Sequence, residues 1–270
     1  MLSPLSFTPE FRRKVAELPK AQRREWLCDL AGQLDLARAR GPRSRSHDDV
    51  LEELAEVARG CRVDLAADVE NHLGPFSPLH LRALREVPRE RFVRDAEIGR
   101  SADDTPLPLD DEGHATISAP HAYLLSFRLL ELGPGDRLLE LGAGSGYGAA
   151  LASSIVGGEG QVVTVEIDAG LCAWASARLS EHGNVRVIHG DAVHLDPMAF
   201  FRPNKITVTF AVDRVPHGWT AMLPEGGRLA VPVGPTDRDQ RLVLVRREKG
   251  ELLATDHGAV RYVQNRSPAR

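Results

Sequence analysis

The sequence predicts an α/β fold, in which a doubly wound, mostly parallel sheet carries a C-terminal antiparallel strand pair and a helical N-terminal extension. Three observations lead to this prediction. Amphipathic helical patterns fill most of the first 90 residues. From residue 136 onward, short apolar runs alternate with helical patterns, which is the order of a mostly parallel sheet covered on both faces. Near the C-terminus this order changes, because two apolar runs are separated only by a turn-rich loop.

The N-terminal part is expected to be a series of helices that end at proline, glycine or polar breakers. These helices are expected at residues 8–38 with a division at Pro19, from Asp48 to an end at Gly60, at about 62–73, and from Ser77 to Glu86. The polar segment 40–47 separates the first from the second. We therefore predict two domains, a helical N-terminal extension over residues 1–75 and an α/β domain over residues 76–270.

The α/β part is expected to alternate strand and helix. The predicted strands span residues 137–141, 161–167, 185–188, 206–210, 227–233, 242–246 and 259–263, and the predicted helices span 147–156 and about 169–181. The strands at 227–233 and 242–246 form the expected antiparallel pair, which is joined by the loop 234–240.

Composition narrows the possible functions. The 270-residue chain carries 34 Lys and Arg against 38 Asp and Glu, so no broad basic field exists for phosphate backbones and no nucleic-acid partner is expected. The three cysteines form no C-x-x-C pair and no His/Cys spacing suggests zinc, so neither a disulfide framework nor a metal site is expected. No apolar run is long enough for a signal peptide or a membrane span, and we expect a cytoplasmic protein without a membrane partner.

A glycine-rich turn between a predicted strand and a predicted helix begins the candidate site. Gly142, Gly144 and Gly146 let the backbone turn sharply and approach a ligand without a Cβ in the way. The dinucleotide fingerprint G-x-G-x-x-G would need its third glycine at the position of Tyr147, so a tight pyrophosphate contact is not favoured. By itself, the glycine turn indicates a ligand site only weakly.

Two carboxylates strengthen the prediction of a ligand site. Glu166 closes the second predicted strand, where a carboxylate can accept hydrogen bonds from both hydroxyls of a ribose. Asp191 follows the third strand, where an adenine amino group could donate to it. Singly, each acid could equally be a helix cap or a solvated loop residue, but together with the glycines they describe a nucleoside pocket at one edge of the sheet. The expected cofactor contacts are Glu140, Gly142, Ala143, Gly144, Ser145, Gly146, Glu166, Ile167, Gly190, Asp191 and Ala192.

Segments on either side of the glycines carry a more specific signal. Upstream, residues 87–93 read V-P-R-E-R-F-V, residues 104–109 read D-T-P-L-P-L and residues 115–121 read A-T-I-S-A-P-H; downstream, residues 223–234 read L-P-E-G-G-R-L-A-V-P-V-G and residues 261–263 read R-Y-V. Together with the glycine turn, these segments resemble the protein-L-isoaspartate O-methyltransferase family of the Rossmann-like S-adenosylmethionine-dependent methyltransferases. The resemblance covers about residues 80–264, and its T-I-S-x-P block is far more specific than the glycines.

The resemblance implies a Rossmann-like methyltransferase domain, S-adenosyl-L-methionine as cofactor, and an isoaspartyl-containing protein or peptide as substrate. The implied activity is methyl transfer to the free α-carboxylate of an L-isoaspartyl residue, the first step in repair of aged Asn and Asp sites. Ser118 would hold this carboxylate by hydrogen bonds, with Thr116 shaping the loop. Without the resemblance, both would be interpreted as an ST-turn that leads into Pro120 and a helix. A carboxylate is already ionised at pH 7, so the reaction needs positioning but no metal.

The chain departs from the family pattern mainly on the substrate side, which leaves alternatives open. The departures are Ser101-Ala102 in place of Ala-Tyr, two extra residues among Asp110, Asp111 and Glu112, Asn204-Lys205 where Asp is usual, a bulky Phe210 expected beside the cofactor, and Gln264-Asn265 in place of Pro-Leu. One alternative is a related carboxylate methyltransferase that tailors Asp or isoAsp in a dedicated peptide. Another is a non-catalytic cofactor-binding interaction module. A hydrolase that uses Ser118 and His121 is disfavoured, because Ser118 lies in no G-x-S-x-G elbow.

Overall fold

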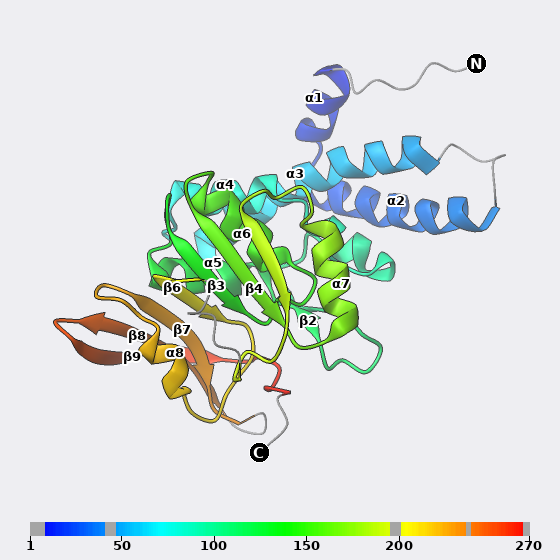
Figure 1. Ribbon diagram of the computed structural model, residues 1–270. Coiled ribbons are helices and arrows are strands. Elements are labelled where there is room, and N and C mark those ends of the chain that lie inside the picture. The colour runs from blue at the N-terminus through cyan, green and yellow to red at the C-terminus, as the bar shows by residue number, and fades with distance from the viewer. Residues whose placement is uncertain (1–8, 41–46, 195–200, 236–238, 267–270) are drawn as a thin grey trace.

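A single large sheet forms the centre of the α/β part in the computed structural model, which describes residues 9–40, 47–194, 201–235 and 239–266. Its strands are β3 (Arg137–Leu141), β4 (Gln161–Glu166), β5 (Val185–His189), β6 (Lys205–Val208), β7 (Arg228–Val233), β8 (Gln240–Glu248) and β9 (Glu251–Val260). In the described residues this sheet has seven strands in the order β5-β4-β3-β6-β7-β8-β9 (Figure 1).

The direction of the strands confirms the predicted fold class. Neighbouring strands from β5 to β7 are parallel, whereas β8 pairs antiparallel with both β7 and β9. The chain moves from β3 outward to β4 and β5 and then crosses back to β6 on the other side of β3. The carboxyl ends of β3, β4 and β6 therefore border the crevice where a doubly wound sheet binds its ligands.

Helices cover the two faces of the sheet unequally. Contacts with the strands are made by α5 (Pro120–Leu130), α6 (Tyr147–Val156) and α7 (Ala169–Arg178), and α8 (His217–Ala221) follows β6. Successive residues of β3 point to opposite faces: Leu138 belongs to the core that contains Tyr147 of α6, and Leu139 to the core that contains Trp219 of α8. Trp219 is 2% exposed and packs in the interior of this second core.

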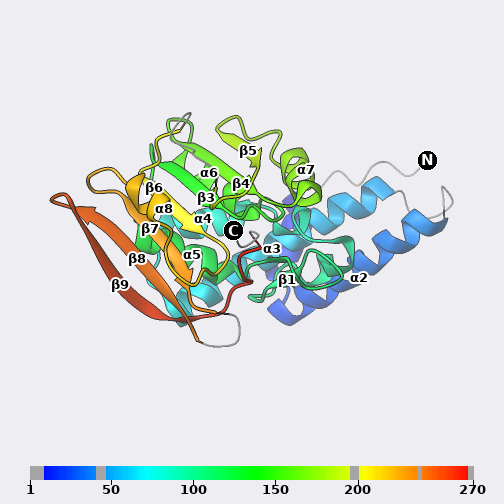
Figure 2. The ribbon, with the colours of Figure 1, turned by 60° about the horizontal axis from the view of Figure 1, so that its bottom comes forward.

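In the described part of the chain, four helices come before residue 87 and confirm the predicted helical N-terminus (Figures 1 and 2). They are α1 (Pro9–Glu17), α2 (Lys20–Arg40), α3 (His47–Leu73) and α4 (Pro78–Glu86). The predicted division at Pro19 is confirmed, but the predicted end at Gly60 is wrong, because α3 continues to Leu73. A Cβ at Gly60 would lie 3.1 Å from Arg23 Cδ and 3.2 Å from Val15 Cγ1. Gly60 therefore lets α1 and α2 approach α3 closely rather than ending the helix.

Short elements connect the helices with the sheet. They are the 3-10 helices η1 (Arg89–Arg91) and η2 (Asp95–Arg100) and the strands β1 (Leu107–Pro108) and β2 (Thr116–Ile117). β1 pairs antiparallel with β2. The T-I-S-x-P block thus runs from β2 directly into the first turn of α5.

The predicted final strand at 259–263 is placed too late in the sequence. β9 begins at Glu251 and forms a hairpin with β8 through Lys249 and Gly250, which both have positive φ. Most side chains of β9 are exposed. An exposed edge strand has no buried face, so it lacks the apolar alternation from which strands are predicted.

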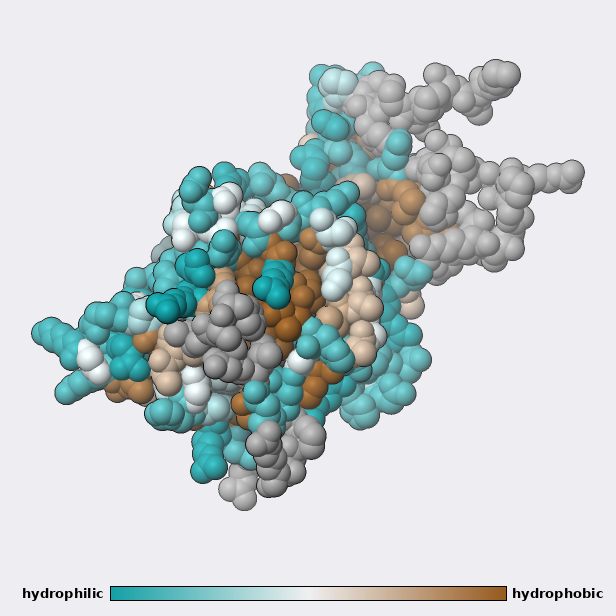
Figure 3. Space-filling model, in the orientation of Figure 1, coloured by the Kyte–Doolittle hydropathy of each residue, from teal (hydrophilic) through white to brown (hydrophobic). Residues whose placement is uncertain are grey.

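No helix in the described ranges is long and apolar enough to cross a membrane, and no group of three His, Cys, Asp or Glu side chains in the same residues could hold a metal ion. Figure 3 shows a largely hydrophilic outer end of the β8–β9 hairpin and hydrophobic residues near the centre of the view.

Candidate active site

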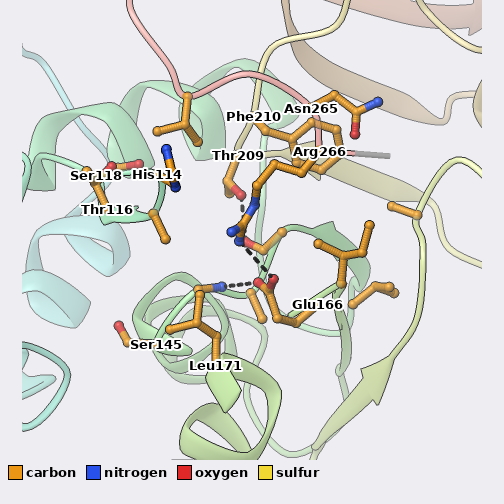
Figure 4. Close-up of a pocket in the computed structure, with 18 of the residues that line it drawn as sticks. His114, Thr116, Ser118, Ser145, Glu166, Leu171, Thr209, Phe210, Asn265 and Arg266 are labelled. Atoms are coloured by element: carbon orange, nitrogen blue, oxygen red, sulfur yellow. Dashed lines mark hydrogen bonds and ion pairs between the residues drawn. The ribbon is translucent and has the colours of Figure 1, made fainter. Parts of the chain in front are cut away.

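A cavity lies at the carboxyl ends of the central strands (Figure 4). Of the predicted cofactor contacts, those that line it are Gly142, Ala143, Gly144, Ser145, Glu166, Ile167, Gly190, Asp191 and Ala192. Thr116 and Ser118 line the same cavity, although they precede β3 in the sequence. The structure therefore brings the predicted cofactor and substrate residues together.

The glycine turn after β3 is held in a backbone conformation that favours glycine. Gly142, Gly144 and Gly146 have φ values of 97°, 54° and 92°, in the left-handed region. A Cβ on Gly142 would lie 2.3 Å from Thr209 Oγ1, and this hydroxyl donates to the Gly142 carbonyl at 2.6 Å. The end of β6 therefore fixes the turn and leaves no room for a side chain at Gly142.

Glu166 closes β4 and is 4% exposed. Its Oε2 accepts a hydrogen bond from the Gly144 amide at 2.7 Å, and its Oε1 accepts one from the Asp168 amide at 3.0 Å. An ionised carboxylate has about four acceptor positions, so these two bonds fix its orientation and leave further positions for a ligand. Figure 4 shows the carboxylate pointing into the cavity.

The second predicted acid, Asp191, lies at the cavity but also organises its own loop. Its Oδ1 accepts from the Val193 amide at 2.9 Å, and its Oδ2 lies 2.7 Å from His194 Nδ1. The amide of the preceding Gly190 donates to the Glu166 carbonyl at 2.8 Å. The third strand end is thus tied to the second.

Two of the expected cofactor contacts, Glu140 and Gly146, do not line the cavity. Glu140 is 1% exposed beneath the glycine turn, where the Thr164 hydroxyl donates to its Oε2 at 2.6 Å and the Ala149 amide also donates to it. Burial, opposed by the Thr164 hydrogen bond and assisted by the nearby Glu166 carboxylate, raises the pKa of Glu140 to about 8. The position of Glu140 favours support of the turn over direct contact with a ligand in this cavity.

Ser118 connects β2 with α5 and is held by its backbone. Its amide donates to the Tyr123 hydroxyl at 3.2 Å, and its carbonyl accepts from Arg89 Nη2 at 3.2 Å. Figure 4 shows Ser118 and Thr116 on the side of the cavity opposite Glu166. The hydroxyl of Ser118 therefore lies where it could meet a substrate that approaches the cofactor cavity from the α5 side.

His121, at the start of α5, interacts with Asp104 through both its backbone amide and its ring. Asp104 Oδ1 accepts from the His121 amide at 3.0 Å, and the imidazole Nδ1 lies 3.0 Å from the same oxygen. Although burial opposes it, the hydrogen bonds from His121 lower the pKa of Asp104. The Asp104 carboxylate thereby caps the amino end of α5.

A second, mainly apolar cavity adjoins the first. Its walls come from α5, from β8 and β9, and from residues 261–263, and Thr116, Ser118, Thr209 and Val263 line both cavities. His121 and Arg261 bring polar groups to its lining. The two cavities therefore meet at Ser118 and Thr116.

The departures from the family pattern divide between the site and the scaffold. Phe210 lines the first cavity as expected and packs edge-on against Trp219, with ring centroids 6.0 Å apart. Gln264 and Asn265 also line it. Asn204 lies instead at the amino end of β6, where its Oδ1 accepts from the Arg137 amide at 2.8 Å, so this departure belongs to the scaffold.

Several residues of the cavity were missed by sequence reasoning. They are His114, Tyr123, Leu171, Thr209 and Arg266. Arg266 reaches into the cavity, and its Nη2 lies 3.8 Å from Glu166 Oε1 (Figure 4). None of these residues belongs to a recognisable motif, and the segment that carries Arg266 is placed by the hydrogen bond from the Asn265 amide to the Ala211 carbonyl, at 2.9 Å.

The glycine turn, the carboxylate at the end of β4 and the order of the strands define a Rossmann-like methyltransferase of the S-adenosylmethionine-dependent class. Residues 75–268 match the family model described as Protein-L-isoaspartate(D-aspartate) O-methyltransferase (PCMT). The chain belongs to this family.

Individual relatives agree with this assignment. A protein-L-isoaspartate O-methyltransferase of Methanothermobacter thermautotrophicus is 40% identical over 174 residues, which cover 63% of this chain and 78% of the relative. Protein-L-isoaspartate O-methyltransferase 1 of Geotalea uraniireducens is 42% identical over 180 residues, which cover 66% of this chain and 80% of the relative.

Solved structures show the same fold. One, named protein-L-isoaspartate O-methyltransferase, is 31% identical with a TM-score of 0.69; the match covers 75% of this chain and 65% of that one, just under two thirds of its length. A beta-aspartate methyltransferase from Plasmodium falciparum, solved in complex with S-adenosyl-L-homocysteine, has a TM-score of 0.67 at 20% identity, with coverage of 76% of this chain and 98% of that one.

Proposed function

We propose that this chain is a protein-L-isoaspartate O-methyltransferase, which uses S-adenosyl-L-methionine to methylate the free α-carboxylate of L-isoaspartyl residues in proteins or peptides. The observation that carries the proposal is the meeting of Ser118, from the T-I-S-x-P segment, with Glu166 and the glycine turn in one cavity. Membership of the family and the names of relatives that are about 40% identical support the same activity.

The residues of the cavity fit the cofactor. The Ser145 hydroxyl is buried at the cavity and has no hydrogen-bond partner among the described residues, and buried polar groups normally have one. When bound, S-adenosylmethionine supplies an electrophilic methyl group on a sulfonium sulfur. Glu166 would accept hydrogen bonds from the ribose hydroxyls of the cofactor, and Asp191 would accept one from its adenine amino group. The backbone of Gly142 to Ser145 would approach the methionine part of the cofactor.

Methyl transfer to a carboxylate requires the protein mainly to bind and orient the two reactants. A carboxylate is already ionised at neutral pH, so methyl transfer to it requires no general base. The Ser118 hydroxyl would donate a hydrogen bond to the substrate carboxylate and orient it, which is catalysis by positioning. The adjoining apolar cavity would receive the chain around the isoaspartyl residue and exclude water.

Methyl transfer from tritiated S-adenosylmethionine to a short isoaspartyl peptide tests this proposal directly. The peptide with normal Asp and the parent peptide with Asn serve as matched substrates, because they differ only at the reacting residue. We expect labelling of the isoaspartyl peptide alone, and a large loss of labelling in Ser118→Ala without loss of cofactor affinity.

Two results would contradict the proposal. Equal labelling of the Asp and isoaspartyl peptides would remove the assigned specificity. Cofactor binding without labelling of any of the three peptides would instead favour a dedicated peptide substrate, with the N-terminal helices as its recognition surface, or a non-catalytic module.

The domain boundary and the setting of the protein belong to the same proposal. We propose that the methyltransferase domain begins near residue 76, which is supported by the start of the family match at residue 75. The cytoplasmic location and the lack of a nucleic-acid partner stay predictions from composition. The isoaspartyl-containing protein is the proposed partner.

A further inference from the structure

Ser118 is held at both of its backbone polar groups by residues from different elements. Its amide donates to the hydroxyl of Tyr123, one turn into α5, and its carbonyl accepts from the guanidinium of Arg89 in η1. Arg89 is fully buried and also donates to the carbonyls of Ser101, Asp103 and Thr105. Arg89 therefore fixes the loop as a whole, and Tyr123 contacts the Ser118 amide individually.

Packing fixes the ring of Tyr123. It meets Tyr147 edge-on, with ring centroids 5.5 Å apart at 84°, and Phe127 at 6.5 Å. A Cβ on Gly148 would lie 2.8 Å from Tyr123 Cε1, so the first turn of α6 leaves no spare room beside the ring. The phenol oxygen therefore has a defined position at the cavity, which Tyr123 also lines.

The Tyr123 hydroxyl acts as an acceptor toward Ser118, because the Ser118 amide donates a hydrogen bond to it. A phenol is both a donor and an acceptor, so the proton of this hydroxyl points away from the Ser118 amide. Because the amide and the side chain of Ser118 belong to one residue, a fixed amide restricts where the Ser118 hydroxyl can lie at the cavity.

We propose that Tyr123 is a positioning residue for methyl transfer, which holds the Ser118 backbone so that the Ser118 hydroxyl is in place to donate a hydrogen bond to the substrate carboxylate. This inference rests on the proposed function. It assigns Tyr123 an effect that operates through Ser118 and does not depend on contact between Tyr123 and the cofactor.

Four variants test the proposal: Tyr123→Phe, Ser118→Ala, the double variant, and Tyr147→Phe. Tyr123→Phe keeps the packed ring and removes the hydroxyl. Tyr147→Phe is a matched control, because the Tyr147 hydroxyl lies in the same aromatic cluster but is buried without a hydrogen-bond partner in the described part of the chain. kcat and KM for the isoaspartyl peptide, and the affinity for S-adenosylhomocysteine by calorimetry, are the measurements.

We expect Tyr123→Phe to lower kcat/KM for the peptide roughly three- to tenfold, as loss of one neutral hydrogen bond does. Affinity for S-adenosylhomocysteine should be unchanged, and Tyr147→Phe should match the wild type. In the Ser118→Ala background, Tyr123→Phe should have no further effect, because the residue through which it acts is already truncated. Wild-type activity in Tyr123→Phe, or an equal loss in both backgrounds, would overturn the proposal.

A second readout separates this proposal from the proposed function. Hydrogen exchange of the Ser118 amide, followed by NMR of the labelled protein, requires no methyl acceptor. We expect severalfold faster exchange in Tyr123→Phe and no change in Tyr147→Phe. If none of the peptides is methylated but exchange accelerates as expected, the proposed substrate is wrong, whereas the positioning of the Ser118 backbone by Tyr123 is supported. Unchanged exchange in Tyr123→Phe would show that the Tyr123 hydroxyl does not position the Ser118 amide.

Discussion

At the scale of single residues, Glu166 combines two tasks in one carboxylate. It accepts hydrogen bonds from the Gly144 and Asp168 amides and so joins the glycine turn to the end of β4. The carboxylate points into the cavity, where it also lies 3.8 Å from Arg266 Nη2 (Figure 4). Charge-assisted hydrogen bonds of this kind are about twice as strong as neutral ones, so Glu166 should contribute both to the shape of the site and to its affinity.

Replacement of Glu166 tests this assignment. We expect Glu166→Ala to weaken binding of S-adenosylhomocysteine by about 1.5 to 3 kcal/mol, the cost of losing hydrogen bonds to a charged group, as measured by calorimetry. Glu166→Gln should weaken binding of S-adenosylhomocysteine less, because its amide oxygen can still accept a hydrogen bond. Glu159→Gln, at an exposed position before β4, is the control and should bind normally. Unchanged affinity in Glu166→Ala would remove this residue from the site.

At the scale of elements, the turn between β3 and α6 lies over a buried carboxyl group. Glu140 leaves no space for a side chain at Gly148, since a Cβ there would lie 2.0 Å from Glu140 Oε1. The pKa of Glu140 is raised to about 8, chiefly by burial. Because the folded protein holds this proton more tightly than the unfolded chain, the stabilisation is complete below the unfolded pKa and is lost as pH rises through about 8.

Glu140→Gln should therefore change how stability depends on pH. The amide cannot ionise, so the variant does not lose this stabilisation as pH rises. The free energy of unfolding of the variant minus that of the wild type should therefore increase from pH 5 to pH 9, by about 1.4 kcal/mol per unit of pKa shift. Urea unfolding at pH 5, 7 and 9 measures this difference, with Glu159→Gln as the control. Parallel pH profiles for Glu140→Gln and the wild type would contradict the raised pKa.

At the scale of the whole molecule, the helical extension and the sheet share one hydrophobic core. The same cluster contains Leu27 and Leu54 from the extension and Leu138 from β3. Arg62 of α3 forms a buried ion pair with Glu90 of η1, and both side chains are 6% exposed. Because this burial connects the two predicted domains, we expect them to unfold together.

Breaking the buried ion pair tests this coupling. Glu90→Ala leaves the Arg62 charge buried without its partner, which typically costs about 3 to 5 kcal/mol. Glu86→Ala removes one partner of the exposed Arg82–Glu86 pair and should cost no more than about 1 kcal/mol. Urea unfolding followed by circular dichroism should show one transition in each protein. Two separate transitions, or equal losses in both variants, would contradict the shared core.

Part of the site was predictable because it lies next to strands. Glu166 and Asp191 come directly after strand patterns, and parallel strands bring their carboxyl ends to one edge, so their proximity follows from the order of the elements. Glu140 shows the limit of this reasoning. It lies within the same motif, yet β3 directs its side chain into the interior beneath the turn.

The sequence by itself determined the elements with a buried and an exposed face, the glycine turn and the family segment that contains Ser118, because periodicity and motif spacing are local properties. Tertiary structure alone decided the continuation of α3 through Gly60, the exposed β9, and the positions of Arg89, Tyr123 and Arg266 around the site. Each of these depends on contacts between segments far apart in the sequence. Arg89 meets Ser118 across 29 residues, and Arg266 meets Glu166 from the other end of the chain. No local pattern records such contacts, because packing between elements creates them.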